Sequence, residues 1–368
     1  MKIAILETDH YQYGLTQSEI FSEAEKLFFV PDKTWHEMME YSPALCSGKH
    51  IAIDTIEKDA DKIIQTCNSE GIDLLLVSPV FDSYQGVYRI AKGVAAKKVI
   101  TIHNLNTWLK SRFHSWNSWK ERKLKQRIVK SFDYIAVEDF IYSYVKNEQP
   151  ALFRKYHFIY IPFTVFSQAK KKQFPKTSNE LKIVLPGSIH HDRRRYEDVT
   201  EVILKLAREK EPVQFSFAGR PIGEYGKKII EMLDEANRIK PGIASYFPME
   251  GEIKPARFLE EMGTSDLVLS TSTKYFKAFG TTELIGKTKP TAAIHDMMSF
   301  ELPGLLPAHL NIPENLKGSA ISYNGKDELY ALIKSYIRNP GHIRELKETA
   351  RKNSLQFTAE KIRKGLPF

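Results

Sequence analysis

The sequence predicts an α/β protein made of two Rossmann-like domains, each a doubly wound parallel sheet, that face each other across a cleft. Three observations lead to this prediction. Short, strongly apolar runs recur along the chain, most are followed by an amphipathic helical pattern, and one lysine-rich segment without apolar periodicity separates two halves. The 368 residues are enough for two domains of ordinary size.

The apolar runs have the character of buried parallel strands, because they are short and apolar on both faces. In the first half they cover 2–9, 72–79, 98–104, 133–139 and 157–163, and in the second half 181–188, 213–219, 243–249, 266–272, 290–296 and 319–325. Between them, helical patterns are clearest at 197–211, 224–239 and 254–263. Regular alternation of strand and helix is typical of α/β folds with parallel sheets.

The domain boundaries follow from the segment "FSQAKKKQFPKTSNE" at 166–180, which is rich in lysine and contains a proline. This composition is typical of a linker. We therefore expect a first domain at 1–165, a second at 181–340, and a C-terminal helix at 341–368 that packs back on the first domain. Ligands of doubly wound sheets bind outside the carboxyl ends of the strands, so polar residues at those ends are candidates for function.

Charge and composition limit the choice of partner. The formal net charge is +9, which favours an anionic partner such as a nucleic acid, an anionic lipid or a phosphorylated ligand. The two cysteines, Cys46 and Cys67, make neither a disulfide framework nor a metal cluster. The apolar start of the chain is too short for a signal peptide, and no apolar run is long enough to span a membrane. We expect a cytoplasmic protein that is soluble or attached to a membrane surface.

A basic loop follows the first strand of the second half. In "PGSIHHDRRRYED" at 186–198, Gly187 and Ser188 form a turn, and Arg193, Arg194 and Arg195 come directly before a helix. Backbone donors beside several guanidinium groups suit a diphosphate. Arg220 follows the next strand in a similar glycine turn. The alternative interpretation is a solvated basic loop.

The stretch "KYFKAFGTTELIGKTKP" at 274–290 predicts a second anion site. Gly280 permits a turn, Thr281 or Thr282 can cap a short helix, and Glu283 lies in its first turn. The free N–H groups of such a helix bind phosphates. The alternative is an ordinary capped helix. No P-loop and no dinucleotide-binding glycine motif follows any predicted strand.

On these residues the chain resembles glycosyltransferases of the GT-B fold, which use nucleotide-diphosphate sugars. The loop at 186–198 resembles the basic loop that faces the donor diphosphate, and Glu283 with Pro290 resembles the second glutamate and the proline of the family's Glu-x7-Glu segment. Tyr275 stands where the family has the first glutamate. The resemblance implies that Gly280, Thr281 and Thr282 contact phosphate, and that Glu283 contacts ribose.

The resemblance also implies catalytic residues in the first half, which would bind the acceptor. "TIHNLNTW" at 101–108 resembles the strand end that presents a histidine, His103, toward the donor sugar or the acceptor. Asp9 is the first candidate for the base that deprotonates the acceptor hydroxyl, ahead of Glu138 and Asp139. Inverting and retaining stereochemistry both stay open. The donor is expected to be a UDP- or GDP-linked sugar, and no metal or other cofactor is expected because arginines and a helix terminus neutralise the diphosphate.

The segment 108–131 combines tryptophans with basic residues. Tryptophan favours the lipid headgroup boundary, and lysine and arginine favour anionic lipid. The expected membrane or acceptor face consists of Trp108, Trp116, Trp119, Lys120, Arg122 and Lys123. A solvated helix with core tryptophans is the next interpretation, and nucleic-acid binding is the least favoured because no nucleic-acid fold signature accompanies the segment.

Together these features predict a cytoplasmic glycosyltransferase of polysaccharide biosynthesis, peripheral at the inner face of the membrane, acting on a surface-glycan or lipid-linked acceptor. Two alternatives stay open. One is a nucleotide-sugar epimerase of similar layout, and the other is a non-catalytic protein that binds a nucleotide-sugar or a polyanion.

Overall fold

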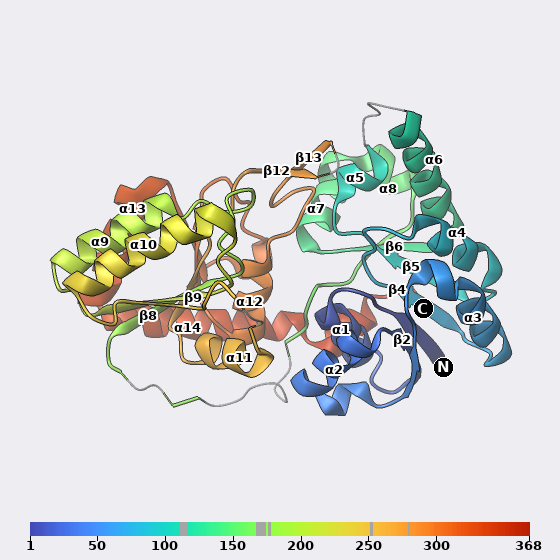
Figure 1. Cartoon of the computed structure of the whole chain (residues 1–368). Helices are drawn as coiled ribbons and strands as arrows, with labels where there is room; N and C mark the ends of the chain where they lie inside the picture. The colour runs from blue at the N-terminus through green and yellow to red at the C-terminus, as the bar shows by residue number, and fades with distance from the viewer. Residues whose placement is uncertain (111–115, 167–173, 176–177, 251–252, 279) are drawn as a thin grey trace. The chain divides into compact units, whose positions relative to one another are not determined.

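The computed structural model describes residues 1–110, 116–166, 174–175, 178–250, 253–278 and 280–368. The chain divides into two compact units. Unit 1 contains Met1–Val165, Lys277–Pro290 and Ala359–Phe368, and unit 2 contains Phe166–Phe276 and Thr291–Thr358. Each unit is a doubly wound α/β domain around a parallel sheet, which confirms the predicted fold class (Figure 1).

The sheet of unit 1 has seven strands in the order β3-β2-β1-β4-β5-β6-β7. Its strands are β1 (Lys2–Leu6), β2 (Glu25–Val30), β3 (Lys49–Ala52), β4 (Leu74–Val77), β5 (Lys97–Thr101), β6 (Tyr134–Val137) and β7 (Phe158–Tyr160). The strand order reverses between β1 and β4, so the topological switch point of this sheet lies beside the carboxyl ends of these two strands. The sequence patterns had not indicated β2 and β3.

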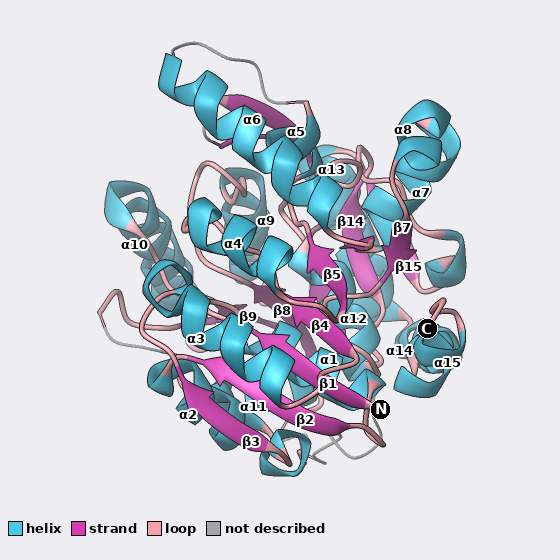
Figure 2. Cartoon of the chain, turned by 90° about the vertical axis from the view of Figure 1, so that its right-hand side faces the viewer, coloured by secondary structure: helices cyan, strands magenta, loops and turns pink. Residues whose placement is uncertain are grey.

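Helices cover both faces of the unit 1 sheet, because successive residues of its strands point to opposite sides. Ala4 and Leu6 pack under one set of helices, while Ile3 and Ile5 pack under the other. The first set is α3 (Ile56–Ser69), α4 (Tyr84–Gly93), α6 (Trp116–Ser131) and α7 (Asp139–Glu148) (Figure 2). The second set is α1 (Tyr11–Ile20), α2 (Asp32–Tyr41) and α15 (Ala359–Lys364). The shorter elements are η1 (Pro43–Cys46), α5 (Leu105–Leu109) and α8 (Pro150–Lys155).

Residues 277–290 return from the second half of the chain to unit 1. Here β12 (Tyr275–Ala278) and β13 (Thr281–Leu284) form a two-stranded sheet, and Gly280 lies in the turn with φ of +71°. The short helix predicted after Gly280 is therefore wrong. Thr281 and Glu283 are buried while Thr282 is exposed, and this alternation with β-branched threonines suits a strand.

The sheet of unit 2 has six strands in the order β10-β9-β8-β11-β14-β15. Its strands are β8 (Leu181–Pro186), β9 (Val213–Ala218), β10 (Ala244–Tyr246), β11 (Leu267–Leu269), β14 (Gly304–Pro307) and β15 (Ala320–Tyr323). On one side lie α9 (Glu197–Arg208), α10 (Gly223–Ile239) and α13 (Gly325–Arg338), and on the other α11 (Pro255–Gly263) and α12 (Ala292–Phe300) (Figure 1). A short 3-10 turn, η3 (Glu314–Leu316), precedes β15.

Two further predictions in the second half need correction. The run 290–296 begins α12 rather than a strand, because Ile294, Met297 and Met298 are buried at helical spacing. The last helix is divided into α14 (Pro340–Ser354), η4 (Leu355–Phe357) and α15. The helix breaks where the Phe166 N–H donates to the Phe357 carbonyl at 2.9 Å. Only the last of the three lies in unit 1.

The predicted linker at 166–180 falls mostly on 167–173 and 176–177, which lie outside the described residues.

Among the residues that the structure does describe, no helix has both the length and the apolar character that crossing a bilayer requires.

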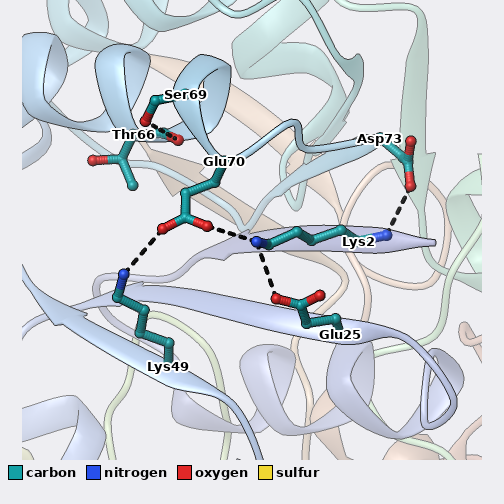
Figure 3. A network of polar contacts seen from close by, with 7 residues as sticks. All are labelled: Lys2, Glu25, Lys49, Thr66, Ser69, Glu70 and Asp73. Carbon is teal, nitrogen blue, oxygen red and sulfur yellow. Dashed lines mark hydrogen bonds and ion pairs between the residues drawn. The ribbon is translucent and has the colours of Figure 1, made fainter.

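A polar network joins the amino ends of the first strands in unit 1 (Figure 3). The Lys2 ammonium lies 2.6 Å from Glu70 and 3.0 Å from Glu25, and the Lys49 ammonium lies 3.0 Å from Glu70. The Lys2 backbone N–H donates to Asp73 at 2.7 Å. These contacts tie the chain together at the edge of the sheet opposite the carboxyl ends, where ligands of this fold bind.

Hydrogen bonds from Lys2 and Lys49 lower the pKa of Glu70 to about 2. A carboxylate with a lowered folded pKa stabilises the protein above its unfolded pKa, and this contribution is lost as pH falls through the folded pKa. We expect Glu70→Gln to be less stable than the wild type at about pH 6 and equally stable near about pH 2. Urea unfolding at both pH values measures this difference, and a difference that does not change with pH would contradict it.

Candidate functional site

Polar residues gather at the carboxyl edge of the unit 1 sheet. Glu7 follows β1, His103 follows β5 by two residues, and Glu138 follows β6. Because parallel strands end at the same edge, these residues come together although they are far apart in the sequence. His103 Nδ1 lies 2.9 Å from Glu138 Oε1, and the Tyr13 hydroxyl of α1 lies 3.2 Å from the same nitrogen. The Tyr13 hydroxyl also donates to Glu138.

The contact between His103 Nδ1 and Glu138 determines which nitrogen of the His103 imidazole carries the proton. A carboxylate beside Nδ1 holds the N–H there and leaves Nε2 with its lone pair. Burial and the Lys289 ammonium lower the pKa of His103 to about 4, against the opposing effect of Glu138. The imidazole is therefore neutral at neutral pH and can accept a proton at Nε2. Burial also lowers the pKa of His10, whose ring centroid lies 6.5 Å from that of His103.

Glu7 is buried at this edge, whereas Asp9 is exposed. The backbone N–H groups of Asp9 and His10 each donate to Glu7 Oε1 at 2.7 Å. Burial raises the pKa of Glu7 to about 7. The catalytic role of Asp9 stays a prediction, and sequence reasoning did not select Glu7. The alternation of Ile3, Ile5 and Glu7 along β1, which places all three on one face, was the signal that could have indicated it.

Glu283 caps helix α5, the helix that follows His103. Its carboxylate accepts the Thr107 N–H at 2.7 Å, the Thr107 hydroxyl at 2.8 Å and the Asn106 N–H at 3.2 Å. The Leu105 N–H donates to the Thr288 carbonyl at 2.9 Å. Three successive amides at the start of α5 thus bind residues of the segment 277–290, which satisfies donors that a helix leaves free.

The segment 277–290 also brings a positive charge to His103. Lys289 is buried and donates to Asn104 Oδ1 at 2.9 Å, one residue beyond His103. Its ammonium contributes to the low pKa of both His103 and His10. No pattern in the sequence indicated that Lys289 belongs to unit 1. The Glu283 side chain has no exposed surface, so its predicted role at a ribose stays a prediction while the geometry supports capping.

In unit 2 the predicted basic loop lies at the carboxyl edge of its sheet. Gly187 follows β8 with φ of +91°, and a methyl group in its place would lie 2.2 Å from Arg194 Nη2. Arg194 Nη1 donates to the Ser188 carbonyl at 3.2 Å. The glycine therefore lets a guanidinium pack directly on the turn, which a side chain would prevent.

The other predicted residues of unit 2 surround this turn. Arg193 stacks on Phe276, with its guanidinium carbon 4.9 Å from the ring centroid, and the Arg195 N–H donates to the Thr271 carbonyl at 2.9 Å. The Arg220 carbonyl accepts the Ile189 N–H at 2.9 Å, so the loops after β8 and β9 are joined. The structure thus brings Gly187, Ser188, Arg193, Arg194, Arg195 and Arg220 together, whereas Gly280, Thr281, Thr282 and Glu283 belong to unit 1.

The same loop of unit 2 contains residues with metal-ligand spacing. The ligand atoms of His190, His191 and Asp192 lie within 4.8 Å of one another. His191 and Asp192 are exposed and already form an ion-pair contact at 2.8 Å, and the neighbouring arginines oppose cation binding. The expectation of a metal-independent reaction stays a prediction.

The predicted tryptophan-rich face needs one correction. Trp108 is 4% exposed and packs edge-on against Tyr84 in the unit 1 core, so it cannot contact a membrane. Trp116 is 65% exposed and stacks on Trp119, with ring centroids 4.7 Å apart. Arg122 is half-buried. One exposed stripe remains along α6, which we call the α6 stripe, formed by Trp116, Lys120, Lys123, Arg127 and Lys130.

Comparison with known proteins agrees with this architecture. No protein-family model matches the chain, and no curated protein does. A glycosyltransferase from Rickettsia africae is 12% identical over 98% of this chain and 95% of its own, with a TM-score of 0.65. Alr3699/HepE of Anabaena in complex with UDP is 13% identical over 99% of this chain and 98% of its own, with a TM-score of 0.59.

A UDP-N-acetylglucosamine 2-epimerase is also similar, with 11% identity over 95% of this chain and 90% of its own and a TM-score of 0.51. These similarities extend over nearly the whole length of each protein. The chain therefore has the GT-B fold, which such glycosyltransferases and this epimerase share, as the sequence predicted.

Removing the Glu283 carboxylate should destabilise the protein, because it leaves buried donors of α5 without acceptors. We expect Glu283→Ala to lower the free energy of unfolding by about 3 kcal/mol. Lys287→Ala, which removes a partly exposed ion pair with Glu148 from the same segment, should cost less than about 1 kcal/mol. Urea unfolding of both variants measures the contrast, and equal effects would show that Glu283 does not support α5.

Proposed function

We propose that this protein is a glycosyltransferase that moves a sugar from a UDP- or GDP-linked donor to a surface-glycan or lipid-linked acceptor. The observation that carries the proposal is the His103 imidazole, which Glu138 and Tyr13 hold at the carboxyl edge of the unit 1 sheet. The GT-B fold and the basic loop of unit 2 add support. His103 Nε2 can accept a proton from a hydroxyl group, because the imidazole is neutral at neutral pH and Nδ1 contacts Glu138.

In the proposed reaction, His103 Nε2 accepts the proton of the acceptor hydroxyl as its oxygen attacks the anomeric carbon. The bond from that carbon to the diphosphate oxygen breaks, and the diphosphate leaves with the electron pair. Glu138 stabilises the imidazolium that forms, because its carboxylate already contacts Nδ1. Asp9, which is exposed on the same loop as Glu7, remains the alternative candidate for the base that deprotonates the acceptor hydroxyl.

The basic loop of unit 2 would stabilise the departing diphosphate. Gly187 and Ser188 provide a turn against which Arg194 packs, and Arg193, Arg195 and Arg220 belong to the loops that meet there. Their guanidinium groups would offset the negative charge as the bond breaks, so we propose that no metal is needed. Phosphate contact by Gly280, Thr281 and Thr282 and ribose contact by Glu283 remain parts of the proposal that rest on the resemblance alone.

The α6 stripe supports docking on an anionic membrane surface at the inner face of the cytoplasmic membrane. The exposed Trp116 at one end and a row of cationic side chains along one helix face combine the two features that favour such a surface. Each basic residue near anionic lipid contributes about 1 kcal/mol to binding. A lipid-linked acceptor in polysaccharide biosynthesis would then lie close to the enzyme.

Two other functions remain possible on this fold. A nucleotide-sugar epimerase is supported by the similarity to the UDP-N-acetylglucosamine 2-epimerase. A non-catalytic protein that binds a nucleotide-sugar or a polyanion is supported by the net charge of +9. The products formed from a nucleotide-sugar distinguish all three.

We expect UDP or GDP to raise the melting temperature of the protein, because a ligand that binds only the folded state stabilises it. Arg194→Met should abolish this shift, while Arg208→Met, an exposed arginine at the far end of α9, should retain it. A shift with neither nucleotide, or one unaffected by Arg194→Met, would contradict the donor site.

Incubation with UDP-sugars then tests the reaction by NMR: free UDP indicates transfer to water or acceptor, and an isomerised nucleotide-sugar indicates an epimerase. His103→Gln should slow UDP release by about 100-fold.

Charge reversal on the α6 stripe should weaken membrane binding. We expect Lys120→Glu/Lys123→Glu to lose binding to vesicles that contain anionic lipid, measured by co-sedimentation at low salt. Lys227→Glu/Lys228→Glu makes the same change in charge at exposed positions of α10 and should bind as the wild type does. Equal loss in both variants would show that total charge, rather than the stripe, determines binding.

A further inference from the structure

Beneath the His103 group, unit 1 contains a row of buried polar side chains that the proposed reaction does not use. Leu6 pairs with Val77 and Val77 with Ile100, so the next residues, Glu7, Ser78 and Thr101, lie side by side across β1, β4 and β5. Ile5, Leu76 and Val99, two positions earlier, all pack on the α1 side of the sheet. Because side chains alternate along a strand, Glu7, Ser78 and Thr101 point to the same side.

Helix α1 covers this row and adds another polar side chain. A methyl group at Gly14 would lie 3.6 Å from Glu7 Cβ, so this turn of the helix lies directly on Glu7. Gln17 is three residues further along and therefore lies on the same helix face. Glu7, Gln17, Ser78 and Thr101 are each 1% exposed.

Three hydrogen-bonding atoms of these side chains have no partner among the described residues. They are Gln17 Oε1, Gln17 Nε2 and Thr101 Oγ1. The Ser78 hydroxyl faces the Glu7 carboxyl and lowers its pKa against the larger effect of burial. A buried polar atom without a partner costs free energy, and several of them in one place are rare in folded proteins. Buried water resolves this cost, since one molecule makes about three hydrogen bonds to such groups.

The charged and titratable groups around Glu7 are Asp9 and His10 in the adjoining loop and Tyr13 on α1. The negative charge of Asp9 adds to burial in raising the pKa of Glu7. Burial, Glu138 and Glu7 all raise the pKa of Tyr13, whose hydroxyl donates to Glu138. Tyr13 therefore lies between the polar row and the His103 group.

We propose that Glu7, Gln17, Ser78 and Thr101 form an internal site for ordered water, and that the Glu7 carboxyl carries a proton in this site. Neither part of the proposal rests on the proposed transferase function.

Infrared spectroscopy on the wild-type protein tests for the proton on Glu7 without any substrate. Protein labelled with ¹³C-glutamate should show the band of a protonated glutamate that disappears around pH 7, the pKa to which burial raises Glu7. Glu7→Gln should lose this band and still cap the loop, because its amide oxygen can accept from Asp9 and His10. Glu70→Gln, which removes a carboxylate from the opposite edge of the sheet, should keep it. A wild-type spectrum without the band, or a band that survives in Glu7→Gln, would overturn the proposal.

A second variant tests the water. Gln17→Leu/Ser78→Ala/Thr101→Val removes the polar atoms around Glu7 with little change in volume. If the site holds water, this variant should raise the pH at which the Glu7 band disappears and lower the melting temperature. An unchanged titration with an equal or higher melting temperature would show that the site holds no water and would overturn the proposed water site. Because neither readout needs nucleotide-sugar turnover, failure here is separate from failure of the transferase proposal.

Discussion

Parallel pairing in the two main sheets is the constraint on which both candidate sites depend. All strands of such a sheet end at the same edge, so residues after β1, β5 and β6 meet there although they are far apart in the sequence. The same rule places the loops after β8 and β9 side by side, where the Ile189 N–H binds the Arg220 carbonyl. The opposite edge carries the lysine and glutamate network that holds the strands together. In the unit 1 sheet, the candidate catalytic residues and the stabilising ion pairs thus lie at opposite edges.

The carboxyl edge of the unit 1 sheet lowers the free energy of unfolding, because it contains more buried polar groups than simple packing would require. Glu7, Glu138 and Lys289 are all buried there, together with the partly buried His103. Buried charges persist in proteins when partners compensate them, and here Glu138 has His103 and Tyr13 while Lys289 has Asn104. Such clusters with perturbed pKa values are more common at functional sites than in structural cores. The electrostatics therefore favour function at this edge independently of any similarity to other proteins.

The sequence was sufficient to predict the fold class and the carboxyl edge of each of the two sheets, because these follow from the apolar runs and the residues after them. It was insufficient where local signals were ambiguous. "PTAAIHD" is apolar enough for a strand, and only the burial of Met297 and Met298 beyond its end shows the helical period. Trp108 and Trp116 belong to one basic segment, yet one is core and the other exposed. Composition could not separate them, since the end of α5 at Leu109 and the start of α6 at Trp116 decide which surface each tryptophan faces.

Glu283 shows why a short motif alone does not establish a binding role. Its spacing to Pro290 suits a ribose-binding glutamate, and its place after Gly-Thr-Thr suits a helix start. The ribose-binding interpretation placed the residue with the basic loop of unit 2. In the structure, β13 instead carries the carboxylate to the free amides of α5, where three donors bind it. A helix N-terminus and a nucleotide both attract a carboxylate through N–H or O–H donors. The local sequence therefore cannot distinguish a glutamate that binds a ligand from one that holds the histidine-bearing loop in place.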